Sequence, residues 1–251
     1  MEPQKLREAT DALIALQKKP QSLDHLPESC QPKSLDEALA LQDALIVAMG
    51  EPVTGWKMSV TPEGAVMRGA ILASRAKPTP ASFPAASVPL LGVEAEIAFR
   101  LLRDLPPRDS DYSRAEIEDA VIALPAIEVV DSRYVSYLKA PSFDRTADFM
   151  SNGGFVYGPA LEGWRKLDLE RIGVSLEVDN SVLVSGNGGH GAGHPILPAI
   201  ALINVFRKTQ GLKAGQVLTT GTYTGLNYVK PGQTVTARFA GFEPVTVTFP
   251  R

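Results

Sequence analysis

GVEAEIAFRL, residues 92–101, alternates apolar and acidic side chains, which predicts a buried β-strand with one polar face. The apolar side chains that share one face are Val93, Ala95, Ile97 and Phe99. Glu94 and Glu96 point together from the other face, with their Cα atoms about 7 Å apart. Two carboxylates at this spacing repel each other, so they need solvent, a basic partner or a metal ion beside them.

A third acid in an apolar context is Glu128, within LPAIEVVDS at 124–132. On its own it fits equally well a strand that turns one face to water. Together with Glu94 and Glu96, it favours a site of three carboxylates that holds a metal ion. Ligands that are all oxygen select a hard cation such as Mg²⁺ or Mn²⁺ over zinc, and three protein ligands leave positions open for water or substrate.

The sequence before this strand has a helical pattern over residues 1–50. Apolar residues recur there at helical spacing: Leu6, Ala9, Leu13 and Leu16. Ser34 and Glu37 have the spacing of a capping box at the start of a second helix, and Gly50 ends that helix. From residue 51, short β-like segments separated by glycine and proline predict a β-rich catalytic domain over residues 51–251.

Further elements are expected in the second half of the chain. A helix should begin after Ser113, with Glu116 completing a capping box, and end at Pro125. GVSLEVDNSVLVSG predicts a β-hairpin over 173–186 with its Asp-Asn pair in the turn. The remaining segments are a helix in PILPAIALINVFRKT (195–209) and strands in QTVTARF (233–239) and PVTVTF (244–249).

The composition suits one soluble domain, or a core domain with a small addition, because 44% of the 251 residues are hydrophobic and 21% are charged. A net charge of −3 provides no basic field for nucleic acid or an anionic membrane. One cysteine, Cys30, excludes an internal disulfide framework and fits a reducing compartment. The sequence lacks a signal-peptide pattern and an apolar run that could span a bilayer, so we expect a cytoplasmic protein.

Six motifs follow one another in the order and at about the spacing of a known enzyme group. They are GWKMSVT, GVEAEIAF, ALPAIEVVDSR, TADFMSNGGFVYG, GHP and LTTGTYTGL. The chain in this respect resembles the 2-keto-4-pentenoate hydratase group of the fumarylacetoacetate hydrolase superfamily, which also contains 4-oxalocrotonate decarboxylases. The resemblance extends over nearly the whole chain, and the glutamates are its most specific part.

The resemblance implies an α+β fold, a mixed β-sandwich roll of the fumarylacetoacetate hydrolase C-terminal type with a helical N-terminal region. It also implies a homo-oligomer. Carried over by position, Glu94, Glu96 and Glu128 would bind the divalent metal ion. Lys57 and Ser151 would lie in the substrate pocket, where Lys57 would donate a proton or offset the three acids.

A small anionic 2-oxo acid suits such a site, because its carboxylate and 2-oxo oxygen can chelate a cation that then stabilises the enolate. We therefore expect a lyase, most simply one that hydrates a 2-hydroxydienoate in aromatic-compound catabolism. Decarboxylases, tautomerases and C–C hydrolases of related 2-oxo acids share the enolate step. A non-catalytic scaffold that binds an oxo acid is the alternative from another class.

One position departs from the resemblance. Hydratases of this group carry an acid before a short Phe-Gly turn after the lysine motif, and the matching stretch here is AVMRGAIL at 65–72. Met67 or Arg68 occupies the place of that acid, and the nearest carboxylate is Glu63. The resemblance therefore supports the metal site more strongly than it supports hydration.

The glycine-rich stretch GNGGHGAGHP, at 186–195, has the glycine spacing of a dinucleotide-binding loop. No Asp or Glu occurs over 180–242 to bind a ribose, which disfavours a nucleotide-binding oxidoreductase. His194 fits a structural role at the start of a helix, and His190 is a candidate proton shuttle. The basic residues of the acid-free stretch should either cover the glutamates or face solvent: Arg207, Lys208, Lys213, Lys230 and Arg238.

Overall fold

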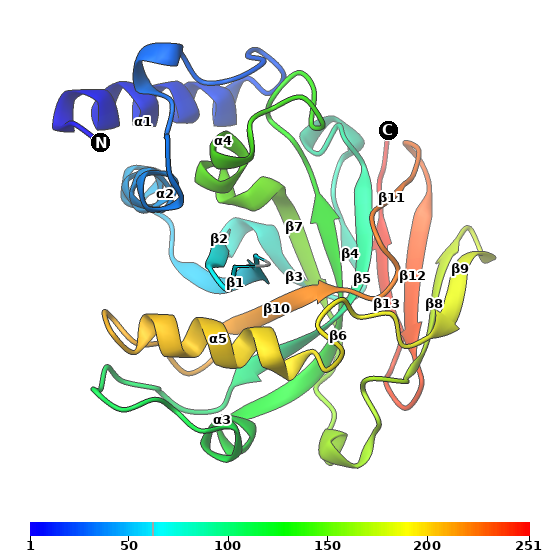
Figure 1. The fold of residues 1–251 in the computed structure, drawn as a ribbon. Coiled ribbons are helices and arrows are strands. Elements are labelled where there is room, and N and C mark those ends of the chain that lie inside the picture. Colours follow the sequence, from blue (N-terminus) through cyan, green and yellow to red (C-terminus); the bar gives the residue numbers. More distant parts are fainter. Residues whose placement is uncertain (62) are drawn as a thin grey trace.

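Two β-sheets form the body of the molecule, and most helices lie beside the larger sheet on the side away from the smaller one (Figure 1). The computed structural model describes residues 1–61 and 63–251. The α-helices in these ranges are α1 (Pro3–Lys18), α2 (Leu35–Met49), α3 (Arg114–Ala120), α4 (Ser142–Ala147) and α5 (Ile196–Phe206). Short 3₁₀ turns are η1 (Glu28–Cys30), η2 (Ala73–Arg75), η3 (Ala85–Ser87), η4 (Phe149–Ser151) and η5 (Trp164–Lys166).

The larger sheet is mixed. Its strands run in the order β2-β1-β10-β5-β6-β7-β3, and β11 also pairs with β5. They are β1 (Val53–Val60), β2 (Val66–Leu72), β3 (Ala76–Pro78), β5 (Gly92–Leu101), β6 (Val121–Val130), β7 (Asn152–Tyr157), β10 (Val217–Thr222) and β11 (Asn227–Tyr228). The pairs β1 with β10 and β3 with β7 are parallel, and the other pairs are antiparallel.

The smaller sheet packs against β5, β6 and β7 to form a sandwich. In the order β4-β13-β12-β8-β9, its strands are β4 (Ala81–Ser82), β13 (Val245–Thr248), β12 (Thr234–Phe239), β8 (Gly173–Val178) and β9 (Ser181–Asn187). Ala95, Ile97 and Ile127 are fully buried in one core with Val235 and Val247 of this sheet. Burying one isoleucine contributes about 1.5 to 3 kcal/mol, and a one-residue slip of β5 would exchange these side chains for its acids. The predicted strand alternation and mixed β-sandwich roll are confirmed.

The helix starts that the sequence predicts are present. The Ser34 hydroxyl accepts a hydrogen bond from the Glu37 backbone N–H at 3.2 Å, and Gly50 ends α2 with a φ of 67°, in the left-handed region that glycine favours. Ser113 and Glu116 form the expected capping box of α3. Because α2 contacts α1, α4 and β2, the N-terminal helices pack directly on the β-rich part of the chain.

The third helix is shorter than the sequence predicts, because α3 ends at Ala120 and β6 begins at the next residue. Pro125, which was expected to end the helix, lies inside β6 opposite Ile97. The Pro125 carbonyl accepts a hydrogen bond from the N–H of Gly158, just beyond the end of β7. The proline nitrogen therefore faces the end of the β6–β7 pairing, where the loss of one backbone hydrogen-bond donor is tolerated. Burial of the apolar residues before Pro125 favours strand over helix.

The hairpin and the C-terminal elements are confirmed. β8 and β9 pair across a turn in which Asp179 and Asn180 have φ values of 50° and 66°, as a tight hairpin turn requires. The helix after the glycine-rich loop, α5, ends at Phe206, three residues before the predicted end. Strands β12 and β13 occupy the two predicted C-terminal segments.

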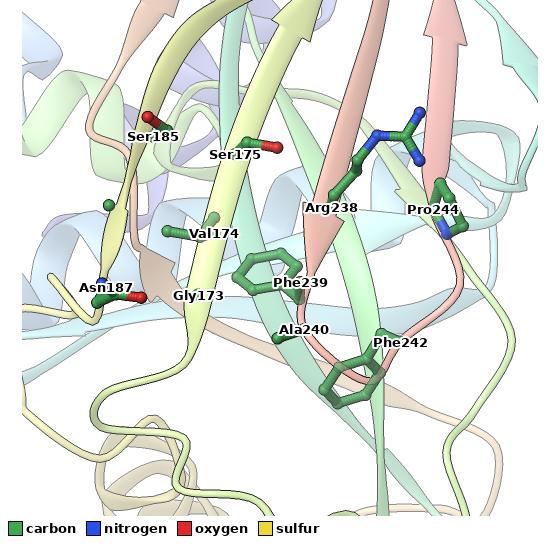
Figure 2. Close-up of a pocket in the computed structure, with 11 residues that line it drawn as sticks. Gly173, Val174, Ser175, Ser185, Asn187, Arg238, Phe239, Ala240, Phe242 and Pro244 are labelled. Atoms are coloured by element: carbon green, nitrogen blue, oxygen red, sulfur yellow. The ribbon is translucent and has the colours of Figure 1, made fainter.

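A hollow of about 580 Å³ lies on the smaller sheet, between the β8–β9 hairpin and the turn after β12 (Figure 2). Its lining includes Ser175, Asn187, Arg238, Phe239 and Phe242. None of the predicted metal ligands or pocket residues lines it. In the described ranges, none of the helices combines the length and the apolar character needed to cross a bilayer.

Candidate metal centre

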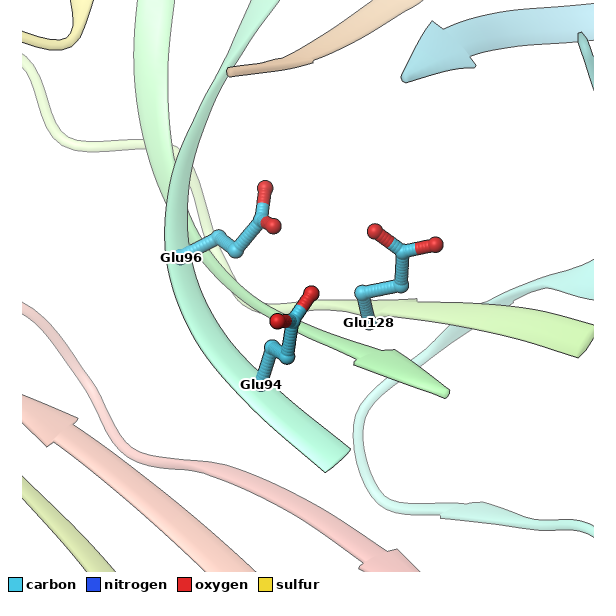
Figure 3. A group of neighbouring side chains, drawn as sticks. All are labelled: Glu94, Glu96 and Glu128. Carbon is cyan, nitrogen blue, oxygen red and sulfur yellow. The ribbon is translucent and has the colours of Figure 1, made fainter. Parts of the chain in front are cut away.

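Three glutamates from two neighbouring strands meet on the face of the larger sheet opposite the sandwich core (Figure 3). Glu94 and Glu96 belong to β5, and Glu128 of β6 lies directly opposite Glu94. One carboxylate oxygen from each residue lies within 4.8 Å of the others. Oxygen ligands bound to one cation at about 2.0 to 2.6 Å lie at most about 5 Å apart, so a single ion can contact all three.

An apolar cluster adjoins the glutamates on the same face of the sheet. It consists of Ile71, Ala98, Leu124, Ala126, Phe155 and Val217. Phe155 of β7 is paired with Glu128, and Ala98 is two residues beyond Glu96. Glu96 and Glu128 are only 2% and 1% exposed, and Glu94 is half-buried. The carboxylates therefore lie where water stabilises their charge poorly.

Without a bound cation, this arrangement favours protonated acids. Burial and next the charge of Glu128 raise the pKa of Glu94 to about 7 and that of Glu96 to about 8. A divalent cation would oppose both shifts, because it would supply positive charge between buried carboxylates that otherwise repel. The donor set, three clustered carboxylates of which Glu94 is partly exposed, fits Mg²⁺ or Mn²⁺.

Strand β10 holds Glu96 in place. The Thr219 hydroxyl donates a hydrogen bond to Glu96 Oε2, and the backbone N–H of Gly221 donates to the same oxygen at 3.2 Å. The pairing of β10 with β5 is irregular between Thr219 and Thr222, and Gly221 has a φ of 116°. This local bulge turns two donors toward one carboxylate oxygen and leaves the other oxygen for a ligand.

Lys57 reaches the same centre from β1. Its Nζ lies 2.5 Å from Glu128 Oε1 and donates a hydrogen bond to the Met150 carbonyl at 3.0 Å. Burial lowers the pKa of Lys57, but the carboxylates of Glu128 and Glu94 together raise it further, so the ammonium keeps its proton. Lys57 lies beside the acids, as predicted, and its ion pair with Glu128 offsets one of the three negative charges.

The segment that carries the Met150 carbonyl has an unusual backbone. Phe149, Met150 and Ser151 all have positive φ values, 53°, 51° and 60°, a conformation that costs free energy for residues other than glycine. Gly69 of β2 makes the close approach possible, because a Cβ there would lie 2.4 Å from the Phe149 carbonyl oxygen and 2.9 Å from Lys57 Cγ. Strain in this segment is therefore concentrated beside Lys57.

Ser151, the last residue of this segment, and Asn152, the residue after it, have different contacts. Ser151 is 2% exposed and lines a cavity together with Lys57, as expected of a pocket residue. Asn152 instead uses its amide to donate to Glu128 Oε1 at 3.3 Å and to the Gly154 carbonyl at 3.3 Å. The amide oxygen of Asn152 is buried without a hydrogen-bond partner in the described part of the chain. Asn152 thus orients a carboxylate of the centre.

Met67, at the position where the resemblance expects an acid, lines the cavity that begins at Lys57. Its neighbour Arg68 points to the other face of β2, where it forms hydrogen bonds with both carboxylate oxygens of Asp43 and lies over the Trp56 ring. The lining of this cavity contains no carboxylate among the residues that the structure describes. The place of the missing acid is therefore apolar.

The two histidines of the glycine-rich loop have separate positions. His190 is 7% exposed, its Nε2 lies 3.0 Å from the Thr220 carbonyl oxygen, and its ring packs on Tyr223. It lines a second cavity, of about 420 Å³, whose lining includes none of the glutamates. His190 therefore contacts the backbone of β10, the strand whose Thr219 and Gly221 donate hydrogen bonds to Glu96. His194 accepts a hydrogen bond from the N–H of Ile196 through Nδ1, which agrees with the expected role at the start of α5.

The basic residues of the acid-free stretch do not cover the glutamates, so that expectation is wrong. Three of them form ion pairs with acids elsewhere: Arg207 with Asp111, Lys213 with Asp104, and Arg238 with Glu177. Lys208 and Lys230 are exposed. The other expectation, solvent exposure, holds for Lys208, Lys213, Lys230 and Arg238, whereas the Arg207 side chain is only 11% exposed beside Asp111.

Sequence reasoning missed the residues that orient the acids. Thr219, Gly221 and the Met150 carbonyl contact the centre only because a bulge and a left-handed segment bring them there. LTTGTYTGL and SNGG, both noted as motifs, contain threonine, glycine and asparagine without a charge. The concentration of glycine beside hydroxyl residues was the available signal.

Comparisons with known proteins agree with this geometry. The family described as fumarylacetoacetate (FAA) hydrolase C-terminal matches residues 44–249. A 2-keto-4-pentenoate hydratase of Paraburkholderia phymatum is 32% identical over 241 residues, 91% of each chain, and one of Burkholderia vietnamiensis is 34% identical over 209 residues, 80% of this chain and 79% of that protein. The solved structure of 4-oxalocrotonate decarboxylase from Pseudomonas putida G7, complexed with magnesium and adipate, has a TM-score of 0.83 at 22% identity and covers 98% of this chain and 97% of that one.

Proposed function

The chain belongs to the fumarylacetoacetate hydrolase C-terminal family, and on that premise we propose that it is a lyase that depends on Mg²⁺ or Mn²⁺ and acts on a small 2-oxo acid or 2-hydroxydienoate. The observation that carries the proposal is the cluster of Glu94, Glu96 and Glu128, with Lys57 in an ion pair at its edge. The hydratases named above support a lyase of this kind, since they match most of the chain.

A divalent cation held by the three glutamates would supply Lewis-acid chemistry, chelating the carboxylate and the 2-oxo oxygen of the substrate and stabilising an enolate. The chain contributes the geometry for this step. Thr219 and Asn152 fix the directions of Glu96 and Glu128. Lys57 holds a proton on Nζ beside Glu128 and can deliver it to a substrate atom bound there.

The cavity beside Lys57 bears on which reaction follows the enolate. A hydratase must direct a water molecule, yet Met67 contributes only an apolar side chain where the resemblance to hydratases implies an acid. Decarboxylation at a carbon conjugated with the 2-oxo group releases CO₂ and leaves the electron pair as an enolate, so it needs the same stabilisation without water activation. This observation favours a decarboxylase as the second candidate, and the hydratase relatives favour the first.

A direct assay separates the two candidates. The purified protein with Mg²⁺ is offered 2-hydroxypenta-2,4-dienoate, 4-oxalocrotonate and an acylpyruvate, and products are followed by absorbance and by CO₂ release. We expect turnover of the dienoate or of 4-oxalocrotonate that EDTA abolishes. Glu96→Gln should abolish it as well while leaving the circular dichroism spectrum unchanged. Full activity after removal of the metal ion by EDTA would contradict the proposal.

We also propose that the chain forms a homo-oligomer. Large apolar side chains are exposed on the β8–β9 hairpin, where Val182 is 61% exposed, and beside α4, where Leu138 is 81% exposed. Exposed apolar side chains of this kind favour association. Sedimentation equilibrium should give a mass that is a multiple of 26.9 kDa, and a single-chain mass at micromolar concentration would contradict this.

A further inference from the structure

A cavity of about 180 Å³ leads away from the metal centre between β2 and the segment around α4. Its lining consists of Lys57, Met67, Tyr137, Ser142, Arg145, Thr146, Met150 and Ser151. Lys57 and Ser151 belong to the candidate site, so a substrate held there has this space available for the rest of its chain. The cavity combines an apolar wall, Met67 and Met150, with a cationic side chain, Arg145.

Arg145 lacks the acidic partner that Arg68 and Arg133 have. Arg68 pairs with Asp43 and Arg133 with Asp148. No acid in residues 1–61 and 63–251 lies within ion-pair distance of Arg145, and its Nε is buried without a hydrogen-bond partner. Its guanidinium lies 5.0 Å from the centroid of the Tyr137 ring, which is its one cation–π contact within those residues. An arginine in this setting has donors available for an anion.

We propose that Arg145 binds a second carboxylate, at the far end of a dicarboxylic 2-oxo acid. This inference rests on the proposed function, because the first carboxylate and the 2-oxo oxygen must be held at the glutamates. The planar guanidinium can donate two parallel hydrogen bonds to one carboxylate, a geometry that an uncharged chain end cannot use. The substrate class is therefore a 2-oxo dicarboxylate rather than a 2-oxo monocarboxylate.

The selectivity has a physical cause on both sides. A dicarboxylate neutralises the unpaired guanidinium and satisfies its donors, whereas a methyl-ended chain would displace water from Arg145 and leave the charge without a partner. The apolar walls at Met67 and Met150 accommodate the methylene groups between the two ends. Ser142 lies beside Arg145 in the lining and offers its hydroxyl group to the same carboxylate, whereas the Thr146 hydroxyl donates to the Ser142 carbonyl at 2.9 Å.

The test compares two saturated ligands that undergo no net conversion and differ only at the far end, 2-oxoadipate and 2-oxohexanoate, by isothermal titration with Mg²⁺-loaded protein. The full chain should bind 2-oxoadipate at least about tenfold more tightly. Arg145→Gln should remove this preference by weakening 2-oxoadipate alone, and Arg145→Lys, which keeps the charge without the fork, should restore part of it. Lys208→Gln is the matched control, since it removes one exposed positive charge just after the end of α5.

The outcomes separate this inference from the proposed function. Equal affinity of the unaltered protein for both ligands would overturn the role of Arg145 while leaving the metal centre supported. An unchanged preference in Arg145→Gln would overturn it too. Binding of neither ligand with Mg²⁺ present would contradict the proposed function itself, and Glu96→Gln should produce that result for both ligands.

Discussion

At the residue scale, the centre depends on groups that fix the carboxylates as much as on the carboxylates themselves. Glu96 accepts hydrogen bonds from Thr219 and Gly221 through one oxygen. Glu128 is held between Lys57 and Asn152. Glu94 is the most exposed of the three and has no such support in the described ranges. The centre thus has two rigid ligands and one freer ligand facing the solvent side.

The hydroxyl of Thr219 should contribute to metal affinity. Thr219→Val keeps the shape of the side chain and removes the donor to Glu96, so we expect Mg²⁺ affinity or turnover to fall about 10- to 100-fold. Titration with Mn²⁺ followed by electron paramagnetic resonance measures this. Thr220→Val is the matched control, because that neighbouring hydroxyl donates to the Ile97 carbonyl instead. Equal effects of the two substitutions would argue against the orienting role.

The raised pKa values predict how the metal-free protein responds to pH. In the folded state the pKa is about 7 for Glu94 and about 8 for Glu96, both above the ordinary 4.5 of the unfolded chain. The folded state therefore holds more protons between about pH 4.5 and 8, so this stabilisation is complete below about pH 4.5, declines as the pH rises above it and is fully lost above about pH 8.

Thermal unfolding in EDTA at several pH values tests this prediction. The melting temperature of the unaltered chain, relative to that of Glu96→Gln, should fall from about pH 5 to pH 8 and level off above that, because the glutamate ionises and the amide does not. Saturating Mg²⁺ should remove the fall by stabilising the ionised acids. A difference between the two proteins that does not vary with pH would show that Glu96 has no raised pKa.

At the element scale, α2 connects the N-terminal helices to the site. Gln42 is fully buried and donates to the carbonyls of Arg68 on β2, at 2.9 Å, and Thr146 on α4, at 2.5 Å. It also accepts from the N–H of Ala70 at 3.2 Å. Both elements that Gln42 connects contribute to the cavity beside Lys57. The helical residues 1–50 therefore support the shape of that cavity.

Loss of Gln42 should be costly. Gln42→Ala leaves three buried backbone groups without partners, and we expect the free energy of unfolding to fall by about 2 to 3 kcal/mol. Urea denaturation measures this, and Gln4→Ala on the exposed face of α1 serves as the control, with an expected change within about 0.5 kcal/mol. A single transition in both proteins would mean that residues 1–50 unfold together with the rest. A separate early transition would indicate an independent N-terminal domain.

Local signals in the sequence were sufficient for most elements. Capping residues placed the helix starts at Ser34 and Ser113, and the Asp-Asn turn placed the β8–β9 hairpin. Alternation in β5 also placed Glu94 and Glu96 on one face. Pro125 was misread because its effect depends on which neighbour its nitrogen faces, and that is set by the pairing of β6 with β7. Which strands pair with each other cannot be predicted from a local sequence pattern.

The candidate site divides in the same way. The three carboxylates could be identified from the sequence, because an acid within a buried strand costs free energy unless a partner or a metal ion compensates its charge. All three lie close together in the structure. The bulge at Gly221 and the left-handed run at Met150 are backbone features without such a signal. The distribution of the basic residues was predicted only as two alternatives, since sequence contains no record of which surface acids, such as Asp111 for Arg207, lie nearby.

At the scale of the whole molecule, one sheet serves two purposes. Its face toward the smaller sheet buries aliphatic side chains and stabilises the fold, and its opposite face gathers the acids, Lys57 and the adjoining cavity. Because β5 and β6 share both faces, the same register that buries Ile97 and Ile127 also sets Glu94 opposite Glu128. Stability and chemistry are therefore fixed by one strand pairing.

The central claim is that the three glutamates hold a cation that supports enolate formation from a 2-oxo acid. Proton exchange at C3 of 2-oxopentanoate in D₂O, followed by NMR, measures that step whichever overall reaction the protein catalyses. We predict exchange that requires Mg²⁺, stops on addition of EDTA and is absent in Glu96→Gln. Exchange no faster than in buffer with Mg²⁺ present, or an equal rate in EDTA, would contradict it.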